Sequence, residues 1–195
     1  MFRKEKRLFM LFAALMAFVV AISNYLVQFP IKYYGLNDLL TYGALSYPVA
    51  FLITDLSNKY YGKKVAKQIV YLGFILGIFL TFYFSTNYQD LISVRIAIGS
   101  GIAFLTAQLI DVQIFHLLRK KKWFVAPLTS SLAGSTIDTF LFFSISFYGT
   151  GVNWVTLSIG DLFVKIFIAL IMLIPFRILL LYVKEISNIK KEINV

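Results

Sequence analysis

The chain has 195 residues, of which 59% are hydrophobic and only 14% are charged, and its mean hydropathy is +0.80. A soluble globular domain carries about 25% charged residues, so polar side chains are too few here to cover a surface that faces water. With no cysteine, the chain has no disulfide, no thiolate metal site and no cysteine nucleophile. Because His116 is the single histidine, we expect no metal site built from histidines.

Long apolar segments separated by short polar connections predict an all-α, polytopic membrane protein with six transmembrane helices. The first segment is about 22 residues long, enough to span the bilayer and longer than the apolar region of about 7–15 residues in a cleaved signal peptide. We therefore expect it to be retained, in one integral membrane domain over residues 1–195. The expected helices cover approximately residues 8–29, 38–58, 65–84, 94–118, 127–148 and 156–183.

Basic residues alternate between the two ends of the expected helices. They gather before the first helix, between the second and third, between the fourth and fifth, and after the sixth, whereas the other three connections together hold only Lys32. The positive-inside rule then predicts that both chain ends lie in the cytosol. This placement also explains the net charge of +10, because basic loops face anionic lipid headgroups. The lipid bilayer is therefore the expected partner, and no nucleic acid is needed to explain the charge.

Polar residues inside apolar helices are costly at membrane depth and mark functional positions. Asp138 lies near the middle of the fifth segment, with Ser131 and Ser135 on the same face and the small residues Ala133 and Gly134 beside them. We interpret Asp138 and Ser135 as part of a binding site that lines a cavity. The alternative is that Asp138 holds two helices together through hydrogen bonds.

The fourth segment carries Gln108 and Asp111 three residues apart, hence on one face. An amide and a carboxylate together suit a small planar heterocycle with hydrogen-bonding edges, and we predict that both face the protein interior. Phe104 and Phe115 extend that face, but packing or lipid contact is the commoner role of phenylalanine in such helices.

Three further polar residues are candidates for substrate contact. Asp55 and Asn58 lie three apart near the end of the second segment; Asp55 either contacts substrate or pairs with Lys59 or a lysine of the following loop. Asn24 is an isolated amide in the first segment, and amides in such positions often bridge helices.

The remaining charged residues in the segments have structural and functional interpretations. Asp161 and Lys165 are four apart in the sixth segment, which predicts either an ion pair or a role in coupling. Arg95 and Arg177 lie near segment ends, where they can extend to the headgroups or, for Arg95, join the coupling group.

No pattern of residues indicates catalysis. The chain has no glycine-rich phosphate-binding loop, and we find no cluster of serine and histidine or of metal ligands. We therefore expect no enzyme and no cofactor. Intramembrane carboxylates without a nucleophile or metal indicate a pathway for a solute or proton.

Three stretches carry a family resemblance. They are ITDLSNKYYGKK (residues 53–64), RIAIGSGIAFLTAQLIDVQIF (residues 95–115) and STIDTFLFFSISF (residues 135–147). They resemble, in order, signatures of the queuosine-precursor transporters, which are six-helix permeases of the vitamin-uptake type. Lys165 and Pro175 fall where that family carries a lysine and a proline, but Lys59 replaces its usual glutamate.

The resemblance implies import of 7-deazaguanine precursors of queuosine, or of queuine, across the inner membrane. It implies a fold similar to the small-molecule-binding subunits of energy-coupling-factor transporters. In this interpretation Asp138 or Asp111 accepts hydrogen bonds from the guanine edge, and Gln108 contacts the carbonyl beside it. A homo-oligomer is compatible with it. Two other classes stay open: a substrate-binding subunit with an ATP-driven partner, and a structural or assembly membrane protein.

Overall fold

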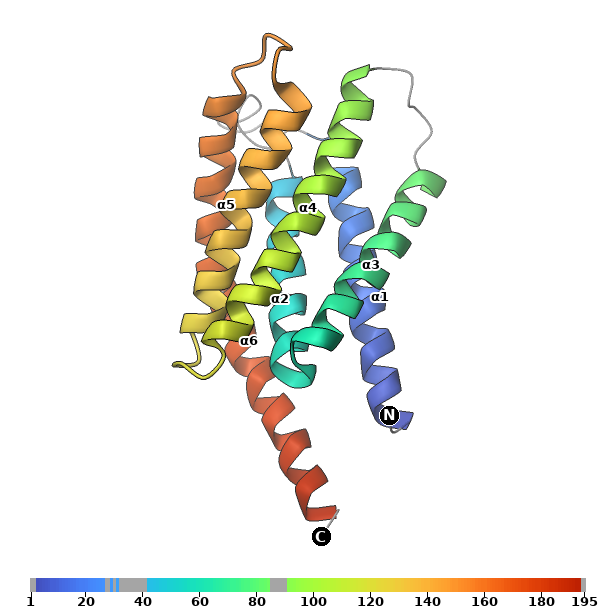
Figure 1. The fold of residues 1–195 in the computed structure, drawn as a ribbon, viewed down its shortest axis with the longest axis vertical. Helices are drawn as coiled ribbons and strands as arrows, with labels where there is room; N and C mark the ends of the chain where they lie inside the picture. Colours follow the sequence, from blue (N-terminus) through green and yellow to red (C-terminus); the bar gives the residue numbers. More distant parts are fainter. Residues whose placement is uncertain (1–2, 27–28, 30, 32–41, 85–90, 194–195) are drawn as a thin grey trace.

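The structure is a computed structural model that describes residues 3–26, 29, 31, 42–84 and 91–193 (Figure 1). These residues are helical almost throughout, which confirms the all-α class. The described part of the chain forms six helices: α1 (Arg3–Leu26), α2 (Gly43–Tyr61), α3 (Lys63–Phe84), α4 (Leu91–Leu118), α5 (Val125–Phe147) and α6 (Trp154–Ile193).

The prediction of a loop between the second and third helices is wrong. α2 continues to Tyr61 and α3 begins at Lys63, so Gly62 alone separates them. Gly62 has φ +85°, a backbone conformation that favours glycine because it has no Cβ, and one such residue is enough to turn the chain. The start expected for the second helix, residues 38–41, lies outside the described residues.

The sixth helix is longer than expected, since α6 runs to Ile193 and includes most of the charged tail. In Figure 1 α6 projects beyond the other helices at the end where the chain terminates. The amino terminus, the α2–α3 turn and the α4–α5 connection lie towards that same end of the bundle (Figure 1). The basic clusters of the sequence are therefore gathered at one end of the molecule.

α2 is the central helix of the bundle, because it packs against each of the other five helices. α4 packs most extensively on α5, and α1 packs on α3. The apolar core joins these layers through side chains such as Met16, Ile69, Phe104 and Phe115. The polar residues of α2 thus lie where neighbouring helices can contact them from several sides.

The outside of the bundle is apolar and much of its inside is polar. Large hydrophobic side chains are exposed on several helices, among them Phe18, Ile75, Phe79, Phe163 and Phe167. Among the described residues, α1, α4 and α6 each hold a stretch long and apolar enough to cross a membrane. A soluble protein shows the opposite arrangement, so this distribution fits a lipid environment.

Small residues allow α1 and α3 to approach closely. A Cβ added at Gly73 of α3 would collide with the Met16 side chain and would lie 3.3 Å from the Ala13 carbonyl oxygen. This contact follows the general use of glycine where membrane helices pack tightly. Gly101 of α4 differs, because a Cβ there would meet the Phe74 ring at an ordinary 3.6 Å.

We predict that Gly73→Ala destabilises the protein by about 1–3 kcal/mol, because the added methyl forces α1 and α3 apart. Gly101→Ala is the matched control: its methyl has room, and alanine favours a helix by up to about 1 kcal/mol over glycine. Thermal unfolding of the detergent-purified variants measures both. A melting temperature of Gly73→Ala equal to or above that of Gly101→Ala would contradict the packing described here.

Candidate functional site

A buried lysine of α6 joins this helix to α5, further from the basic end of the bundle than Asp55. The Lys165 Nζ lies 2.9 Å from Asp138 Oδ2 and 2.6 Å from Asp161 Oδ2, and Thr139 donates to Asp161 at 2.8 Å. All four side chains are buried. Of the two interpretations given to Asp161 and Lys165, the ion pair is present in the structure, and Asp138 belongs to the same ion cluster. Because one lysine faces two carboxylates, we call this group the Lys165 cluster.

A second polar network continues from the Lys165 cluster to α1, α2 and α4. The Lys165 Nζ lies 5.7 Å from the centre of the Tyr47 ring. The Tyr47 hydroxyl donates to Asn24 Oδ1 at 2.9 Å, and Ser100 donates to the same oxygen at 2.9 Å. Asn24 therefore bridges three helices, as amides in such positions often do. Tyr47 and Ser100 were not singled out from the sequence, because hydroxyls are common in membrane helices.

Nearer the basic end, the acid of α2 faces hydroxyls of α5. Asp55 accepts hydrogen bonds from Ser130 at 3.1 Å and from Ser131 at 3.4 Å. Thr54 donates to Gln108 Oε1 at 2.5 Å, and Asn58 donates to the Val112 carbonyl at 2.8 Å. We call this group, together with Asp111, the inner polar layer.

The inner polar layer is only partly satisfied. Gln108, Asp111, Asn58 and Ser135 are completely buried, which confirms that Gln108 and Asp111 face the protein interior. Yet no hydrogen-bond partner reaches Gln108 Nε2, Asn58 Oδ1, Ser135 Oγ or either Asp111 oxygen. A buried polar atom without a partner costs about 1–3 kcal/mol. Several such atoms in one layer indicate a place where a ligand or a proton can bind.

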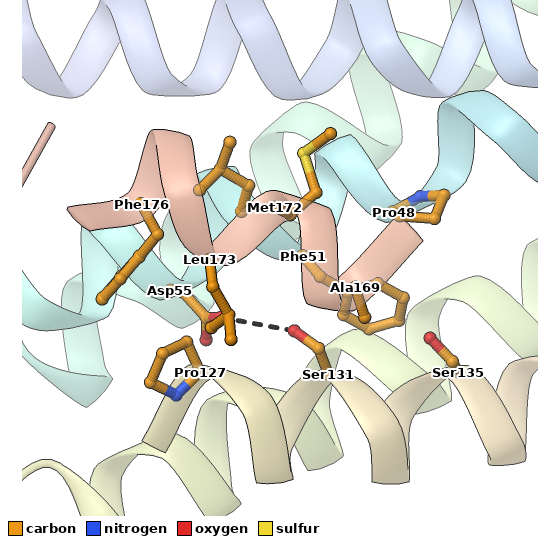
Figure 2. Close-up of a pocket in the computed structure, with 11 residues that line it drawn as sticks. Pro48, Phe51, Asp55, Pro127, Ser131, Ser135, Ala169, Met172, Leu173 and Phe176 are labelled. Atoms are coloured by element: carbon orange, nitrogen blue, oxygen red, sulfur yellow. Dashed lines mark hydrogen bonds between the residues drawn. The ribbon is translucent and has the colours of Figure 1, made fainter. Parts of the chain in front are cut away.

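A pocket lies between α2, α5 and α6 (Figure 2). Asp55 and Ser131 line it, joined by their hydrogen bond, and Ser135 follows one turn further along α5 (Figure 2). The apolar part of the wall comes from three helices and includes rings that the sequence analysis did not single out. Its residues are Pro48, Phe51, Leu52, Pro127, Ala169, Met172, Leu173 and Phe176.

The pocket is nearly closed in this conformation. Its volume of about 10 Å³ is near the minimum for one water molecule, whereas ligand pockets are about 300–1,000 Å³. Gly134 contributes to the tight fit, since a Cβ there would lie 2.5 Å from the Phe51 ring. A bound solute therefore requires the helices around the pocket to separate.

The predicted site residues fall into separate places. Asp55 belongs to the inner polar layer and, with Ser135, also lines the pocket, while Gln108, Asp111 and Asn58 lie in the inner polar layer and are not among the lining residues. Asp138 lies in the Lys165 cluster. Sequence spacing could group residues of one helix, but it could not show which helices meet.

Arg95 and the two phenylalanines have packing roles in this structure. Arg95 donates to the Ile145 carbonyl at 3.1 and 2.9 Å and to the Tyr148 carbonyl at 2.8 Å, so it caps the end of α5. Phe104 stacks on Phe74, and Phe115 meets Phe176 edge-on. Both phenylalanines are buried, as the packing interpretation predicted.

Two more basic residues hold the ends of helices. Lys59 donates to the Arg119 carbonyl at 2.9 Å, and Arg119 donates to the Lys59 carbonyl at 3.2 Å. The end of α2 is thereby fixed to the end of α4. The Arg177 guanidinium lies 5.0 Å from the Trp123 ring centre, at cation–π distance.

Within the described residues, no group of three or more histidine or acidic side chains is arranged to hold a metal ion. The chemistry offered by the site is instead that of carboxylates, hydroxyls and one amide beside aromatic rings. Such groups bind a planar polar molecule or exchange protons.

Comparison with known proteins places the chain in a family. A family model described as a putative vitamin uptake transporter matches residues 41–180. A probable queuosine precursor transporter of Haemophilus influenzae is 35% identical over 81% of this chain and 80% of its own length. The queuosine precursor transporter of Escherichia coli is 30% identical, over 90% and 88% respectively.

A probable queuosine precursor transporter of Bacillus subtilis is 26% identical over 80% of this chain and 77% of its own length. No solved structure matches the chain. The matched region includes the pocket, the Lys165 cluster and the inner polar layer. The chain therefore belongs to the family of putative vitamin uptake transporters and queuosine precursor transporters, and it is a multi-pass membrane transporter.

Proposed function

We propose that this protein imports a queuosine precursor, a 7-deazaguanine base or queuine, across the inner membrane. The names of the relatives in Haemophilus influenzae and Escherichia coli support this substrate. The chemistry of the pocket supports it independently of those names.

The observation that carries the proposal is a carboxylate and an unpaired hydroxyl facing one pocket between aromatic rings. Asp55 and Ser135 line the pocket, and Phe51 and Phe176 form part of its wall (Figure 2). The guanine edge of a 7-deazaguanine presents neighbouring N–H donors, which a carboxylate accepts well. Its flat ring can stack on phenyl groups, with about 1–3 kcal/mol per stacked base in nucleic-acid complexes.

We propose Asp55 and Ser135 as direct substrate contacts. Gln108, Asp111 and Asn58 lie behind them with unpaired polar atoms, and they complete the site when the pocket widens. Asp138 acts through the Lys165 cluster, which couples α5 to α6. Asn24 shapes the outer end through Tyr47. Alternating access is then a tilt of α6 and α5 against α2, around the pocket they share.

We further propose that all six helices span the membrane with both chain ends in the cytosol. The basic clusters support this topology, because they occupy the single end of the bundle that holds both termini (Figure 1).

Reporter fusions test the topology. We predict cytosolic signals from reporters inserted at Gly62, between α2 and α3, and at Lys121, between α4 and α5. A reporter at Gly151, between α5 and α6, is the control and is expected to give the opposite signal. A periplasmic signal from Gly62 or Lys121 would exclude this orientation.

Uptake of labelled deazaguanine bases tests the function, in cells that lack their own synthesis and transport of these bases. We predict that the wild-type chain restores uptake and that Asp138→Asn abolishes it while the protein stays folded. Asparagine keeps the size of Asp138 but weakens its hold on Lys165, which now lies 2.9 Å away. Loss of a charge-assisted bond costs about 1.5–3 kcal/mol, or about ten- to a hundredfold in affinity where it contributes to binding.

The melting temperature of Asp138→Asn distinguishes a role of Asp138 in transport from a purely structural role as a tether between helices. Lys165 keeps Asp161 as a partner at 2.6 Å, so we expect only a modest decrease. Wild-type uptake with a lowered melting temperature would show that Asp138 is a tether between helices. Absence of uptake by the wild-type chain would refute the proposed function itself.

Two serines of α5 provide a sharper test of the pocket. Ser135 and Ser146 are both fully buried and both lack a hydrogen-bond partner, but only Ser135 lines the pocket. We predict that Ser135→Ala weakens substrate binding about two- to tenfold, since one hydrogen bond contributes about 0.5–1.5 kcal/mol. Neither Ser135→Ala nor Ser146→Ala should lower the melting temperature, because each removes an unsatisfied polar atom.

Ser146→Ala should leave affinity unchanged, which makes it the matched control. Calorimetric titration with a deazaguanine base measures both affinities. Equal affinities of the two variants would remove Ser135 from the site.

A further inference from the structure

Two buried acids lie together in the inner polar layer. Asp55 comes from α2 and is 2% exposed, and Asp111 comes from α4 and is 0% exposed. Hydrogen bonds from Thr54 to Gln108 and from Asn58 to the Val112 carbonyl join α2 to α4 at the level of the two acids, and the two carboxyl groups interact electrostatically. Asp55 accepts its hydrogen bonds from the neutral hydroxyls of Ser130 and Ser131. The pair therefore brings two negative charges to one buried place.

Asp111 is the unusual member of the pair. Both of its oxygens are buried, and neither receives a hydrogen bond from a donor group of the protein. Its neighbour Asp55 is also an acceptor when ionised, so two ionised carboxylates would face each other without a donor between them. Two carboxylates that share a buried site cannot both ionise readily. A single proton removes the conflict, because one carboxyl then donates to the other and Asp111 gains its partner.

Three basic groups on the helices around the pair bond to partners outside it. Lys59 of α2 donates to the Arg119 carbonyl. Lys165 of α6 contacts Asp138 and Asp161, and Arg119 of α4 bonds to the end of α2. Facing side chains of α5 are hydroxyls, and those of α6 in the shared pocket are apolar. Other charged or titratable groups on these helices include Lys6 and Arg7 on α1, Lys59 on α2, Lys63, Lys64 and Lys67 on α3, Arg95, His116 and Arg119 on α4, Asp138 on α5, and Asp161, Lys165 and Arg177 on α6, with Glu5 on α1.

We propose that Asp55 and Asp111 form a proton-binding site, and that its proton is carried together with the substrate. The second half rests on the proposed function. Asp55 lines the pocket, whereas Asp111 is not among the lining residues. With the proton on Asp111, Asp55 is the ionised oxygen pair that accepts the N–H donors of the substrate. Proton and substrate then bind together rather than compete.

Release of the proton completes the cycle. When it leaves towards the cytosol, both carboxylates are ionised and repel each other across the α2–α4 contact. That repulsion pushes α2 and α4 apart within the inner polar layer, while the bonds between Lys59 and Arg119 keep the ends of the two helices together. A proton bound from the outer side returns the pair to the protonated state. One proton and one substrate enter in each cycle, and no other reactant is consumed.

Infrared difference spectroscopy of the purified protein tests the proton without any substrate. We expect a band from a protonated carboxyl group in the wild type at neutral pH, and isotope labelling of aspartate should shift it. Asp111→Asn should remove the band, and Asp55→Asn should move it by changing the partner of Asp111. Asp161→Asn is the matched control and should keep the band, because Asp161 is paired with Lys165.

The wild-type spectrum alone can refute the proton site, so the test is decisive even if one of the variants does not fold. Absence of a protonated aspartate band at neutral pH would overturn it. A band that survives Asp111→Asn in folded protein would also overturn it, by placing the proton elsewhere.

Transport in proteoliposomes tests the coupling. With one proton per neutral substrate, a gradient of one pH unit should accumulate a deazaguanine base about tenfold. Asp111→Asn should not accumulate the base, and any transport it retains should only bring the inside and outside concentrations to a ratio near one. Accumulation driven by sodium, or wild-type uptake indifferent to the pH gradient, would refute the coupling. Failure of the wild type to bind any deazaguanine would instead refute the proposed function, while the infrared band would still report the proton site.

Discussion

Lipid offers no hydrogen-bond partner, so every polar side chain at membrane depth must find its partner inside the bundle. The Lys165 cluster meets this constraint most completely: one ammonium contacts two carboxylates and the Thr139 hydroxyl. Removing one partner of a buried ion pair costs about 3–5 kcal/mol when the other charge is left alone. α5 and α6 are therefore held as a unit, which packs on α2 and, through α5, on α4.

The inner polar layer satisfies the same constraint only in part, and this difference indicates which part of the bundle can rearrange. Tyr47, Asn24 and Ser100 connect their helices through mutual hydrogen bonds, whereas Gln108, Asn58 and Asp111 retain unpaired atoms. Satisfied networks stabilise one arrangement, and unsatisfied groups leave the alternatives close in energy. Movement is thus expected where the polar groups are unpaired, around the pocket and towards the basic end.

The sequence predicted contacts within a helix better than contacts between helices. The spacing of Asp161 and Lys165 predicted their ion pair, and the spacing of Gln108 and Asp111 predicted a shared buried face, because helical geometry determines which residues are neighbours. No spacing could predict that Asp138 meets Lys165 or that Asp55 meets Ser130, since those pairs depend on which helices pack together. The all-α class followed from composition, but the loop expected around Gly62 did not form.

The position of α2 explains how these parts can act together. It packs on all five other helices, and its successive turns carry Tyr47 beside Lys165, Phe51 in the pocket wall and Asp55 beside Asp111. One helix therefore contacts the ion cluster, the pocket and the acid pair in turn. A change of charge at Asp111, beside Asp55, acts on the same helix that closes the pocket through Phe51. Because packed helices move as rigid bodies rather than bending freely, the central helix supplies a physical route from the acid pair to the substrate site.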